Sequence, residues 1–571
     1  FILVGGNLSG IQKYIFGITR NSGKGVSKIF RARSFYLQAL IRAALIDIQR
    51  TTGLLGACRL LDSGGKFILL LPDTEDIRRK IEQFDRELQI WFRDKFKGTV
   101  TLSLSWHTRL KHQDFMLESF RFQIDRLNET LEAVKYQKLC KTFSEQGMVI
   151  EEGYEQTEAG NCTLCGINSA DPESIKHYSQ KTESEIAICR DCSDQILYFG
   201  SKLPRTRYLV YGTTEKAPVY RDIRITLSAD PPPVIDNDIL HVEALVDKPG
   251  FGRYRLARHL PTLLENDLAD ENWFRVFEQD LDFERTDGQS VPMTFNMIAH
   301  KSKKRIPDKL VGRSLLGFMK ADVDNLGLIF GLGLGDRLSV ARFTMMSRML
   351  HIFFSEYLVE LLKKEFPYIY VVFAGGDDLF LVGPWWQTVD FAITLREHFS
   401  MFCAENPDIT LSCGLLPARP RLPMKRAVEL VETYLENAKS HDSRSRRKDS
   451  ICFMGETVSW VEMKELMALG RQFDQAVEQK SRTKFSTAFL YRLMEYHKMY
   501  RRFIEGGEIK SGRYLSLAHY DIGRNIISGN KDNQAELDML FRIFSVGVDE
   551  RPELNRLNIP LFYAINMNRE S

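Results

Sequence analysis

The residues best suited to chemistry in this sequence are aspartates that lie close together in two short segments. Asp322 and Asp324 lie two positions apart in KADVDNLG, and VVFAGGDDLFLVGP places Asp377 and Asp378 directly after two glycines. Neighbouring carboxylates repel each other and raise each other's pKa, so their presence side by side predicts that a cation binds there. We take Asp322, Asp377 and Asp378 as candidate catalytic residues and as ligands of Mg²⁺ or Mn²⁺.

Nucleotidyl transfer is the reaction that such carboxylates typically support. It uses two divalent cations, one to activate a hydroxyl group and one to neutralise the leaving pyrophosphate. Magnesium prefers oxygen ligands and keeps several waters. We expect Asp322 and Asp377 to be direct ligands, with Asp378 as a second ligand or close support. Asp324 is the weaker candidate, because its strand is expected to end near Asn325.

Residues around these aspartates could hold the triphosphate of a nucleotide. Gly375 and Gly376 would permit positive φ in the turn and a close approach of the phosphates. The other candidates for nucleotide binding are Lys439, Lys448, Ser347 and Arg348. Each assignment has a structural alternative, because basic runs and Gly-Gly-Asp-Asp turns also occur on solvated surfaces.

An internal repeat indicates which elements position the aspartates. One copy runs from Ile2 to Pro72 and the other from Gly317 to Pro384. In the first copy, Asn7 of NLS and the first glycine of the Gly-Gly pair, Gly64, are 57 positions apart. In the second copy, Asp322 of DVD and Gly375 are 53 positions apart. TLSLSW and TLSCGL follow at similar distances, and each is followed by a helical pattern. The order predicts a ferredoxin-like βαββαβ domain, the palm of many nucleotidyl transferases, in each copy.

The two copies differ where the chemistry is expected. The second copy has DVD and GGDD, whereas the first has Asn7 and Ser9 in NLS, and Lys66 and Phe67 in GGKF. The first copy therefore keeps the glycines of the turn and lacks all four carboxylates. We interpret it as a degenerate palm and the second copy as the active one.

Two cysteine pairs predict a structural zinc site. They occur as NCTLCG and ICRDCS, and 23 residues separate the pairs. Two C-x₂-C knuckles are typical of a tetrahedral four-thiolate zinc site that has no open position for catalysis. The ligands would be Cys162, Cys165, Cys189 and Cys192. His177, between the pairs, is not an expected ligand, and a redox pair of disulfides is the alternative.

Composition points to a multidomain protein of the reduced cytoplasm. The chain has 571 residues, 44% of them hydrophobic and 27% charged, with a net charge of +3. We find no apolar run of about 20 residues that could span a bilayer, and we expect no membrane partner. Nine cysteines in a chain this long do not indicate a secreted disulfide framework.

The fold class predicted is α+β. We expect a degenerate palm at 1–148, a zinc-ribbon-containing α/β linker domain at 149–311, a GGDD palm at 312–458 and a C-terminal α-helical bundle at 459–571. KSKKRIPDK, at 301–309, is expected to be a loop. Six basic residues give the helical bundle a possible RNA-binding face, although a solvated face is the simpler interpretation. They are Lys480, Arg482, Lys484, Arg492, Arg501 and Arg502.

The motifs together resemble a known family. NLSGIQKYIF, the degenerate GGKF, the paired C-x₂-C, KADVDNLG, FAGGDDLFLVG and KDSICFMGETVSW occur in the order found in the large catalytic subunit of type III CRISPR effector complexes. The Csm-like (III-A/III-D) branch is the most similar. The resemblance covers most of the chain, and its motifs match at Asp322, Asp377 and Asp378 and at the four cysteines.

The resemblance implies an activity and a set of partners. With target RNA bound to the guide RNA, the active palm of such subunits converts ATP to cyclic oligoadenylates. The 3′-hydroxyl of an acceptor ATP near the degenerate palm would attack the α-phosphate of a donor ATP held by the GGDD palm. The implied partners are a small helical subunit, backbone subunits, a guide-tag-binding subunit, guide RNA and target RNA.

Many members of the family also carry an N-terminal histidine-aspartate nuclease domain. These 571 residues do not contain its motif, so we expect no cleavage of single-stranded DNA unless an upstream segment supplies it. The chain begins inside an apolar run, FILV, and we expect its native start to lie upstream. His441 and Asp442 lie in a charged segment and are not interpreted as a phosphohydrolase site.

Two other functions remain open from the sequence. A stand-alone diguanylate or adenylate cyclase would use one palm and a sensory module, and product from GTP alone would favour it. A non-catalytic scaffold in an RNA-guided complex would keep GGDD only as a remnant. The intact Asp322, Asp377 and Asp378 argue against the scaffold.

Overall fold

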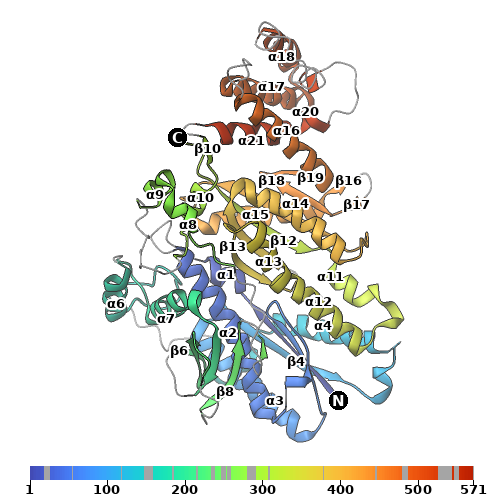
Figure 1. The fold of residues 1–571 in the computed structure, drawn as a ribbon. Helices are drawn as coiled ribbons and strands as arrows, with labels where there is room; N and C mark the ends of the chain where they lie inside the picture. The colour runs from blue at the N-terminus through green and yellow to red at the C-terminus, as the bar shows by residue number, and fades with distance from the viewer. Residues whose placement is uncertain are drawn as a thin grey trace.

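The structure is a computed structural model. It describes residues 1–17, 26–54, 56–117, 119–146, 158–182, 185–213, 217–232, 238–245, 252–253, 259–278, 291–306, 309–376, 378–443, 446–478, 486–524, 540, 543–544 and 552–569. The N-terminal sheet and the C-terminal helices lie at opposite ends of an elongated molecule, and a second sheet lies between them (Figure 1). The predicted α+β class and the helical C-terminus are confirmed.

The first repeat forms a four-stranded antiparallel sheet in the order β2-β3-β1-β4. Its strands are β1 (Ile2–Ser9), β2 (Arg59–Ser63), β3 (Lys66–Leu71) and β4 (Thr101–Arg109). Its helices are α1 (Ile11–Phe16), α2 (Val26–Thr52), α3 (Glu75–Phe96) and α4 (Phe120–Tyr136). Ile2 and Val4 belong to a different group of buried side chains from Leu3, because successive residues of a strand face opposite sides of a sheet.

The second repeat forms a six-stranded sheet in the order β13-β14-β12-β15-β18-β19. Its strands are β12 (Leu316–Val323), β13 (Tyr370–Gly375), β14 (Asp378–Pro384), β15 (Leu411–Ala418), β18 (Ser450–Phe453) and β19 (Glu456–Ser459). The helices are α11 (Leu326–Leu328), α12 (Val340–Ile352), α13 (Leu358–Glu365), α14 (Trp385–Phe402) and α15 (Met424–Ser440). The first four strands have the same order as the sheet of the first repeat, and β18 extends the sheet parallel to β15.

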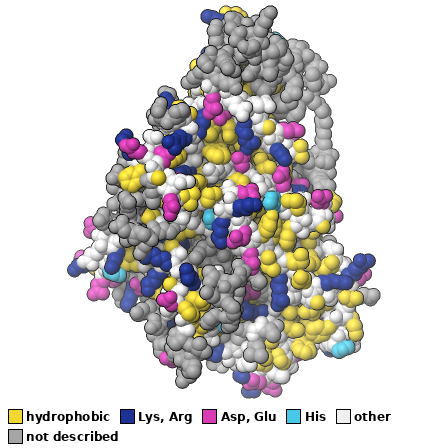
Figure 2. All heavy atoms as spheres, viewed as in Figure 1, with side chains coloured by type: hydrophobic (Ala, Val, Ile, Leu, Met, Phe, Trp, Pro, Cys, Tyr) yellow, Lys and Arg dark blue, Asp and Glu magenta, His cyan; other side chains and the backbone are white. Residues whose placement is uncertain are grey.

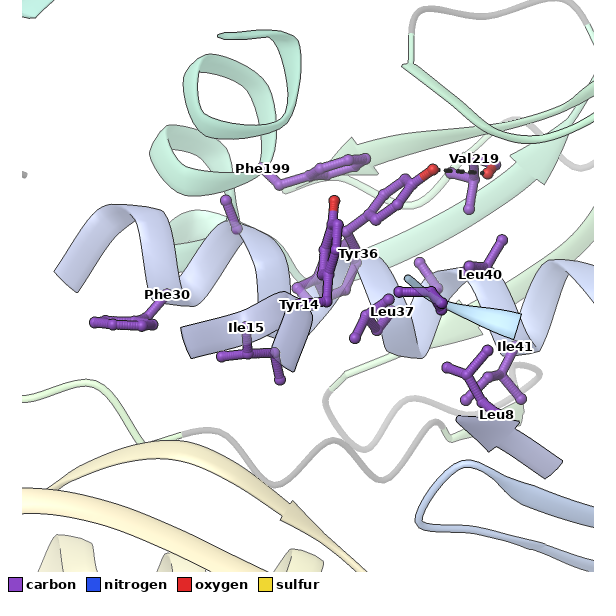
Figure 3. Close-up of a cluster of buried hydrophobic side chains, with 14 of the residues drawn as sticks. Leu8, Tyr14, Ile15, Phe30, Tyr36, Leu37, Leu40, Ile41, Phe199 and Val219 are labelled. Atoms are coloured by element: carbon purple, nitrogen blue, oxygen red, sulfur yellow. Dashed lines mark hydrogen bonds between the residues drawn. The ribbon is translucent and has the colours of Figure 1, made fainter. Parts of the chain in front are cut away.

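The segment between the repeats shares a hydrophobic core with the first repeat. It contains α5 (Cys140–Gln146), α6 (Pro172–Thr182), α7 (Arg190–Gln195) and a sheet in the order β6-β7-β5-β8-β9. The strands are β5 (Tyr208–Gly212), β6 (Ala217–Tyr220), β7 (Ile223–Ser228), β8 (Ile239–Ala244) and β9 (Gly252–Arg253). Figure 3 shows Tyr14 and Tyr36 beside Phe199, and the Tyr36 hydroxyl donates a hydrogen bond of 3.2 Å to the carbonyl of Val219. This segment is therefore packed onto α1 and α2.

The residues before the second sheet form α8 (Glu265–Ala269), α9 (Glu271–Glu278), α10 (Phe295–His300) and a small hairpin. The hairpin consists of β10 (Lys304–Ile306) and β11 (Lys309–Val311). The prediction of a loop at 301–309 is therefore wrong, because Lys304 and Ile306 pair with Val311 and Lys309 across the hairpin.

The C-terminal helices are α16 (Trp460–Glu478), α17 (Thr487–Gly506), α18 (Tyr514–Ile522), α20 (Pro552–Asn555) and α21 (Asn558–Asn568). The last of these, α21, returns to the second repeat. Phe562 and Tyr563 lie edge-on to Trp385, with ring centroids 5.3 Å and 5.4 Å away. Within the described part of the chain, no helix is long and apolar enough to cross a membrane.

One face of the molecule is rich in exposed apolar side chains. Figure 2 shows them gathered on the side where Figure 1 places α12 and α4. Met345 and Met349 of α12 are 58% and 40% exposed, and Phe122 of α4 is 66% exposed. The opposite side of α12 carries the buried Phe343 and Ser347. This helix therefore separates an exposed apolar surface from the interior between the two repeats.

Candidate active site

The acidic residues of the second repeat meet across two neighbouring strands. Asp322, near the end of β12, pairs directly with Asp378, the first residue of β14. Directly opposite residues of an antiparallel pair face the same side of the sheet, with Cβ atoms about 5 Å apart. Asp377, predicted as a direct ligand, lies outside the described residues. Asp378, which the sequence favoured less, is therefore the acid that the strand register places beside Asp322.

Ammonium groups compensate the two carboxylates. Lys439 Nζ of α15 lies 2.9 Å from Asp322 Oδ2, and Lys320 Nζ lies 3.8 Å from Asp378 Oδ2 and also contacts Glu432. Burial alone would lower the pKa of Lys439, but the neighbouring Asp322 carboxylate raises it above its usual value. The predicted role of Lys439 near the aspartates thus has a geometric basis, with its charge directed at Asp322.

The first repeat also reaches this site. Gln12 of α1 donates a hydrogen bond of 3.2 Å from Nε2 to Asp378 Oδ2, and Phe16 of the same helix packs against Phe380 with ring centroids 4.7 Å apart. Sequence reasoning missed Gln12, because its position depends on how the two repeats face each other. It also missed Lys320, although Lys320 shares a strand face with Asp322 by simple alternation.

The donors at this site suit a hard divalent cation. Asp322 and Asp378 offer carboxylate oxygens from two fixed strands, and their side chains are 21% and 25% exposed. Magnesium is typically held by one or two carboxylates together with substrate phosphates and water. The two ammonium groups already compensate negative charge there. The residues present therefore fit Mg²⁺ or Mn²⁺, and a carboxylate from Asp377 would add to the set.

Asp324 has a different role from the metal ligands. The strand ends at Val323, as the sequence suggested, and Asp324 is completely buried. Its Oδ2 accepts hydrogen bonds from Thr410 Oγ1 at 2.7 Å, Ser412 Oγ at 3.0 Å and the backbone N of Asp449 at 3.2 Å. This carboxylate therefore ties the end of β12 to β15 and to the segment before β18.

Lys448 lies beside the end of the same strand. Its Nζ donates a hydrogen bond of 2.6 Å to Asn325 Oδ1, and Asn325 adopts a left-handed conformation with φ of 57°. Arg396 fixes the neighbouring Asp449 through two contacts of 2.6 Å and 2.9 Å. The predicted phosphate-binding Lys448 is thus held beside Asn325, just beyond the strand that carries Asp322.

The glycine turns of the two repeats contact each other. A Cβ atom added to Gly64 would lie 2.9 Å from the carbonyl oxygen of Gly375, and one added to Gly375 would lie 3.1 Å from Gly64 Cα. Gly64 and Gly376 have φ of 61° and 67°. Gly64 and Gly376 are therefore favoured by their positive φ. Gly64 and Gly375 are also required by the close contact between the hairpins.

The hairpin registers correct the alignment of the repeats by one residue. Gly375 pairs with Asp378 around one two-residue turn, and Ser63 pairs with Lys66 around the other. Lys66 therefore corresponds to Asp378, not to Asp377 as the Gly-Gly pairs suggested. Asn7 pairs with Lys66 where the second sheet pairs Asp322 with Asp378. An amide and an ammonium group replace two carboxylates and cannot chelate a divalent cation.

Two cavities lie between the repeats. The larger, about 310 Å³, is lined by residues of both, including Ser34 of α2, Ser347 and Arg348 of α12, and Gly375. The smaller, about 180 Å³, is mostly apolar and is lined by Lys66, Phe330, Phe343, Ser347 and Gly376. The start of α12 is fixed by Ser339, whose side chain accepts a hydrogen bond from the backbone N of Arg342. Ser347, predicted as a nucleotide-binding residue, contributes to both cavities.

The four predicted zinc ligands come together. The Sγ atoms of Cys162, Cys165, Cys189 and Cys192 all lie within 4.8 Å of one another, and they form the one group of three or more such ligands found in the described part of the chain. Their softness and number fit a tetrahedral zinc site. Gly166 has φ of 65°, as the first knuckle requires, and the backbone N of Ile167 donates to Cys165 Sγ at 3.4 Å.

The cysteine cluster is attached to α2. Arg33 Nη2 lies 3.8 Å from Cys192 Sγ, and Arg31 donates to the carbonyl of Gly200 at 2.9 Å and 2.6 Å. Helix α6 lies between the cysteine pairs, and an isolated bridge between Asn161 and Ser169 encloses the first pair. The cluster and the residues after it are therefore packed against α2 of the first repeat.

The basic residues of the C-terminal helices are partly engaged within the protein. Arg492 Nε lies 2.7 Å from Asp521, and Arg501 lies 2.7 Å from Glu505. Arg502 is exposed. Lys480, Arg482 and Lys484 lie outside the described residues. Because Arg492 and Arg501 already pair with carboxylates of the protein, they are weaker candidates for contacts with RNA.

Comparison with known families agrees with this arrangement. Residues 315–452 match the model of the Cas10/Cmr2 second palm domain, and residues 1–149 match that of Csm1 subunit domain B. The chain is a homologue of Cas10/Csm1. The first of these matches contains Asp322, Ser347, the GGDD segment, Lys439 and Lys448. The second contains the sheet that carries Asn7 and Lys66.

Curated Cas10/Csm1 relatives are similar over most of the chain. The protein of Methanocaldococcus jannaschii is 26% identical over 471 residues, which is 77% of this chain and 56% of the relative. That of Thermococcus onnurineus is 25% identical over 553 residues, 92% of this chain and 65% of the relative. Both are named CRISPR system single-strand-specific deoxyribonuclease Cas10/Csm1 (subtype III-A). The chain thus spans between about half and two thirds of the length of these relatives.

Solved structures share the fold. A Csm1–Csm4 cassette in complex with one ATP aligns with a TM-score of 0.70 at 19% identity, covering 100% of this chain and 70% of that chain. A Csm1–Csm4 cassette in complex with cA4 aligns with a TM-score of 0.67 at 18% identity, again covering 100% of this chain and 70% of that chain. The arrangement of the two sheets and the C-terminal helices is therefore that of Csm1.

Proposed function

We propose that this chain is the large subunit of a type III CRISPR effector complex and synthesises cyclic oligoadenylates from ATP when target RNA is bound. The observation that carries the proposal is the cross-strand pair of Asp322 and Asp378. The same position in the other sheet holds Asn7 and Lys66, so only one of the two sheets has paired acids to bind metal. Csm1–Csm4 cassettes that share the fold were solved in complex with one ATP and with cA4.

We assign the architecture accordingly. Residues 1–148 and 312–458 are two ferredoxin-like palms, the first degenerate, and their common strand order supports this. Residues 149–311 form the linker domain with a zinc ribbon, and residues 459–571 form the helical domain. The four-cysteine cluster would bind structural Zn²⁺.

Asp322 and Asp378, together with Asp377, would hold Mg²⁺ or Mn²⁺. When bound, these ions activate an attacking hydroxyl group and neutralise the leaving pyrophosphate. Lys439 lies 2.9 Å from Asp322 and would contact the triphosphate after that ion pair opens. Lys448, beside Asn325, would bind the same phosphates. Both ammonium groups would stabilise the negative charge that develops on the phosphates.

The contact between the hairpins supports a site in which two substrates would bind side by side. Gly375 and Gly376 would let the donor nucleotide approach the backbone, and Ser347 lines both cavities between the repeats. The acceptor nucleotide would bind on the side of the first palm, so that its 3′-hydroxyl reaches the α-phosphate of the donor. Holding both reactants in one chain removes most of the entropic cost of their encounter.

The proposed partners follow from the family. They are the small helical subunit, backbone subunits, the guide-tag-binding subunit, guide RNA and target RNA, and the complex would act in the cytoplasm. The fold relatives were solved as Csm1–Csm4 assemblies. Curated relatives are named for a single-strand-specific deoxyribonuclease, and our proposal concerns the second palm alone.

The test uses the assembled complex with guide RNA, matching target RNA, ATP and Mg²⁺, and mass spectrometry of the products. We expect cyclic oligoadenylates, and a loss of about 100-fold or more in rate for Asp322→Asn. Glu429→Gln is the matched control, because Glu429 lies on α15 with a half-exposed side chain. Product from GTP alone would support a diguanylate-type cyclase. Absence of any oligonucleotide would support the scaffold and contradict the proposal.

A further inference from the structure

The larger cavity has a charged wall that the proposed reaction does not explain. Arg42 of α2 lies at its centre, with Nη1 3.2 Å from Asp62 Oδ2 of β2 and Nη2 in contact with Glu243 of β8. All three residues line the cavity. Arg42 and Glu243 side chains are only 8% and 3% exposed. Burying charges this deeply is costly unless they are paired, so the cluster is a built feature of the wall.

Asp62 is the member of this cluster that is accessible from the cavity. Its side chain is 34% exposed. Its Oδ2 is 3.2 Å from Arg42 and 3.1 Å from Arg59. Among the described residues, no hydrogen bond or ion pair uses its other oxygen, Oδ1. The two guanidinium groups fix the carboxylate while one acceptor oxygen remains for a ligand.

The charge of Asp62 selects the part of a nucleotide that can bind there. A carboxylate accepts hydrogen bonds and repels phosphates. The neutral hydrogen-bond donors of an adenine nucleotide are its 6-amino group and its sugar hydroxyls. The reacting hydroxyl must reach the phosphate near Asp322 and Asp378, which lie on central strands, whereas Asp62 lies on β2, the edge strand of the first sheet. The 6-amino group is therefore the donor that suits Asp62.

We propose that Asp62 reads the 6-amino group of an adenine base seated in the larger cavity, with Arg42 and Glu243 as positioning residues. The inference rests on the proposed use of ATP and adds a determinant of base choice. Seated in the same pose, guanine and hypoxanthine would present the oxygen at position 6 to the Asp62 carboxylate. Sites built to hydrogen-bond an amine reject analogues that lack it, because the buried polar group then remains unpaired.

The contribution of Glu243 links the base to an element outside both palms. Glu243 belongs to β8 of the five-stranded sheet, and His241 Nε2 of the same strand lies 3.2 Å from its Oε1. Arg42 Nη2 also lies 3.2 Å from His241 Nε2. The linker domain thus fixes Arg42, and Arg42 in turn fixes Asp62. Base recognition in this cavity requires three elements of the chain: α2, β2 and β8.

The deciding experiment compares ATP with inosine triphosphate in the assembled complex, for the natural chain and for Asp62→Asn. An asparagine amide can donate to the 6-oxygen. In Asp62→Asn, the ratio of kcat/KM for ATP to kcat/KM for inosine triphosphate should therefore fall at least tenfold, mainly through changes in KM. Asp76→Asn is the matched control, because Asp76 lies on α3 with an exposed side chain paired to Lys80. It should leave the preference unchanged. Glu243→Gln, which reaches Asp62 through Arg42, should narrow the preference less.

A binding measurement separates this inference from the proposed reaction. Calorimetry of the full chain with purine riboside triphosphate, which lacks the 6-amino group, should give at least tenfold weaker binding than ATP, and Asp62→Asn should reduce that difference. Equal binding of the two nucleotides, or an unchanged ATP preference in Asp62→Asn, would overturn the role of Asp62. If the natural complex made no product from ATP, the proposed reaction would fail, while the calorimetry would still decide base recognition.

Discussion

Gly64 and Gly375 touch backbone to backbone, and this contact brings the two hairpins of the repeats together. The carbonyl oxygen of Gly375 lies only 2.9 Å from the position that a Cβ atom of residue 64 would occupy. The larger cavity includes both glycines in its wall. The spacing between the two repeats at this point is therefore set by the smallest side chain available.

Gly64→Ala should separate the hairpins. Its φ of 61° costs any residue with a Cβ about 1–2 kcal/mol, and the clash with Gly375 adds to this. Gly53→Ala is the matched control, because Gly53 also has positive φ, 71°, but nothing lies within 4 Å of an added Cβ. The unfolding temperature and the rate of product formation should both fall further in Gly64→Ala than in Gly53→Ala. Equal effects of the two substitutions would contradict a role for the contact.

Asp378→Asn should lose activity and gain stability in the absence of divalent cations. Like charges directly opposite each other in a sheet are destabilising, and removing one should raise the free energy of unfolding by roughly 0.2–1 kcal/mol. Adding Mg²⁺ should stabilise the natural chain more than the variant. Thermal unfolding with and without Mg²⁺ measures both effects. A variant that is less stable than the natural chain without metal would show that Asp378 serves the fold.

Asp324→Asn should have the opposite signature. Asp324 is completely buried and accepts three hydrogen bonds through one oxygen. Its replacement weakens charge-assisted hydrogen bonds, and we expect a loss of about 3 kcal/mol. Urea denaturation should detect this loss of stability. Unlike Asp378→Asn, the variant should not be more stable than the natural chain in the absence of divalent cations. If the variant instead abolished Mg²⁺-dependent stabilisation while the fold stayed intact, Asp324 would be a metal ligand.

The cysteine cluster should contain one bound zinc ion per chain. Elemental analysis of the purified protein checks this, and Cys162→Ser should lower both the zinc content and the unfolding temperature. Cys140→Ser is the control, since Cys140 is exposed and lies outside the cluster. Disulfides in place of zinc would be revealed by thiol titration under denaturing conditions.

Acidification below about pH 6.5 should destabilise the C-terminal helices. Burial lowers the pKa of His497, although its hydrogen bond of 2.9 Å with the carbonyl of Leu554 opposes the shift. A depressed pKa in the folded state means that the unfolded chain binds the proton more readily. The stability contributed by neutral His497 is thus complete above about pH 6.5 and is lost as the pH falls.

His497→Gln tests this pH dependence. A glutamine amide can still donate to the carbonyl of Leu554, but it does not titrate. The variant should show a smaller fall in unfolding temperature between pH 7 and pH 5 than the natural chain. His259, whose pKa is also lowered by burial, remains in both proteins and provides the background. Parallel curves for the two proteins would contradict the contribution of His497.

Much of the site could be predicted from the sequence, because it depends on short motifs that occur in both copies of the internal repeat. The two Gly-Gly turns and the strands around them predicted the common strand order and the proximity of Asp322 to the second hairpin. The cysteine spacing predicted the cluster in the same way. Alternation along β12 could also have identified Lys320, which faces the same side as Asp322.

Other features could not be read from the sequence because they depend on pairing or on contacts between the repeats. The one-residue shift that aligns Lys66 with Asp378 is set by hydrogen-bond register, which an alignment on glycines does not reveal. The contact of Gln12 with Asp378 depends on how α1 of one repeat meets the other sheet. The contact of Arg42 with Glu243 involves β8, in a segment that had no recognised motif.

The return of α21 to Trp385 has a practical consequence for dissecting this protein. The final helix covers the indole ring, and its backbone also accepts hydrogen bonds from Gly312 and Arg313 just before the second sheet begins. A fragment cut at 312 and 458 would expose a large aromatic surface and leave amide groups unsatisfied. Anyone wishing to excise the catalytic half as an independent unit should splice the last turns of the polypeptide back onto it.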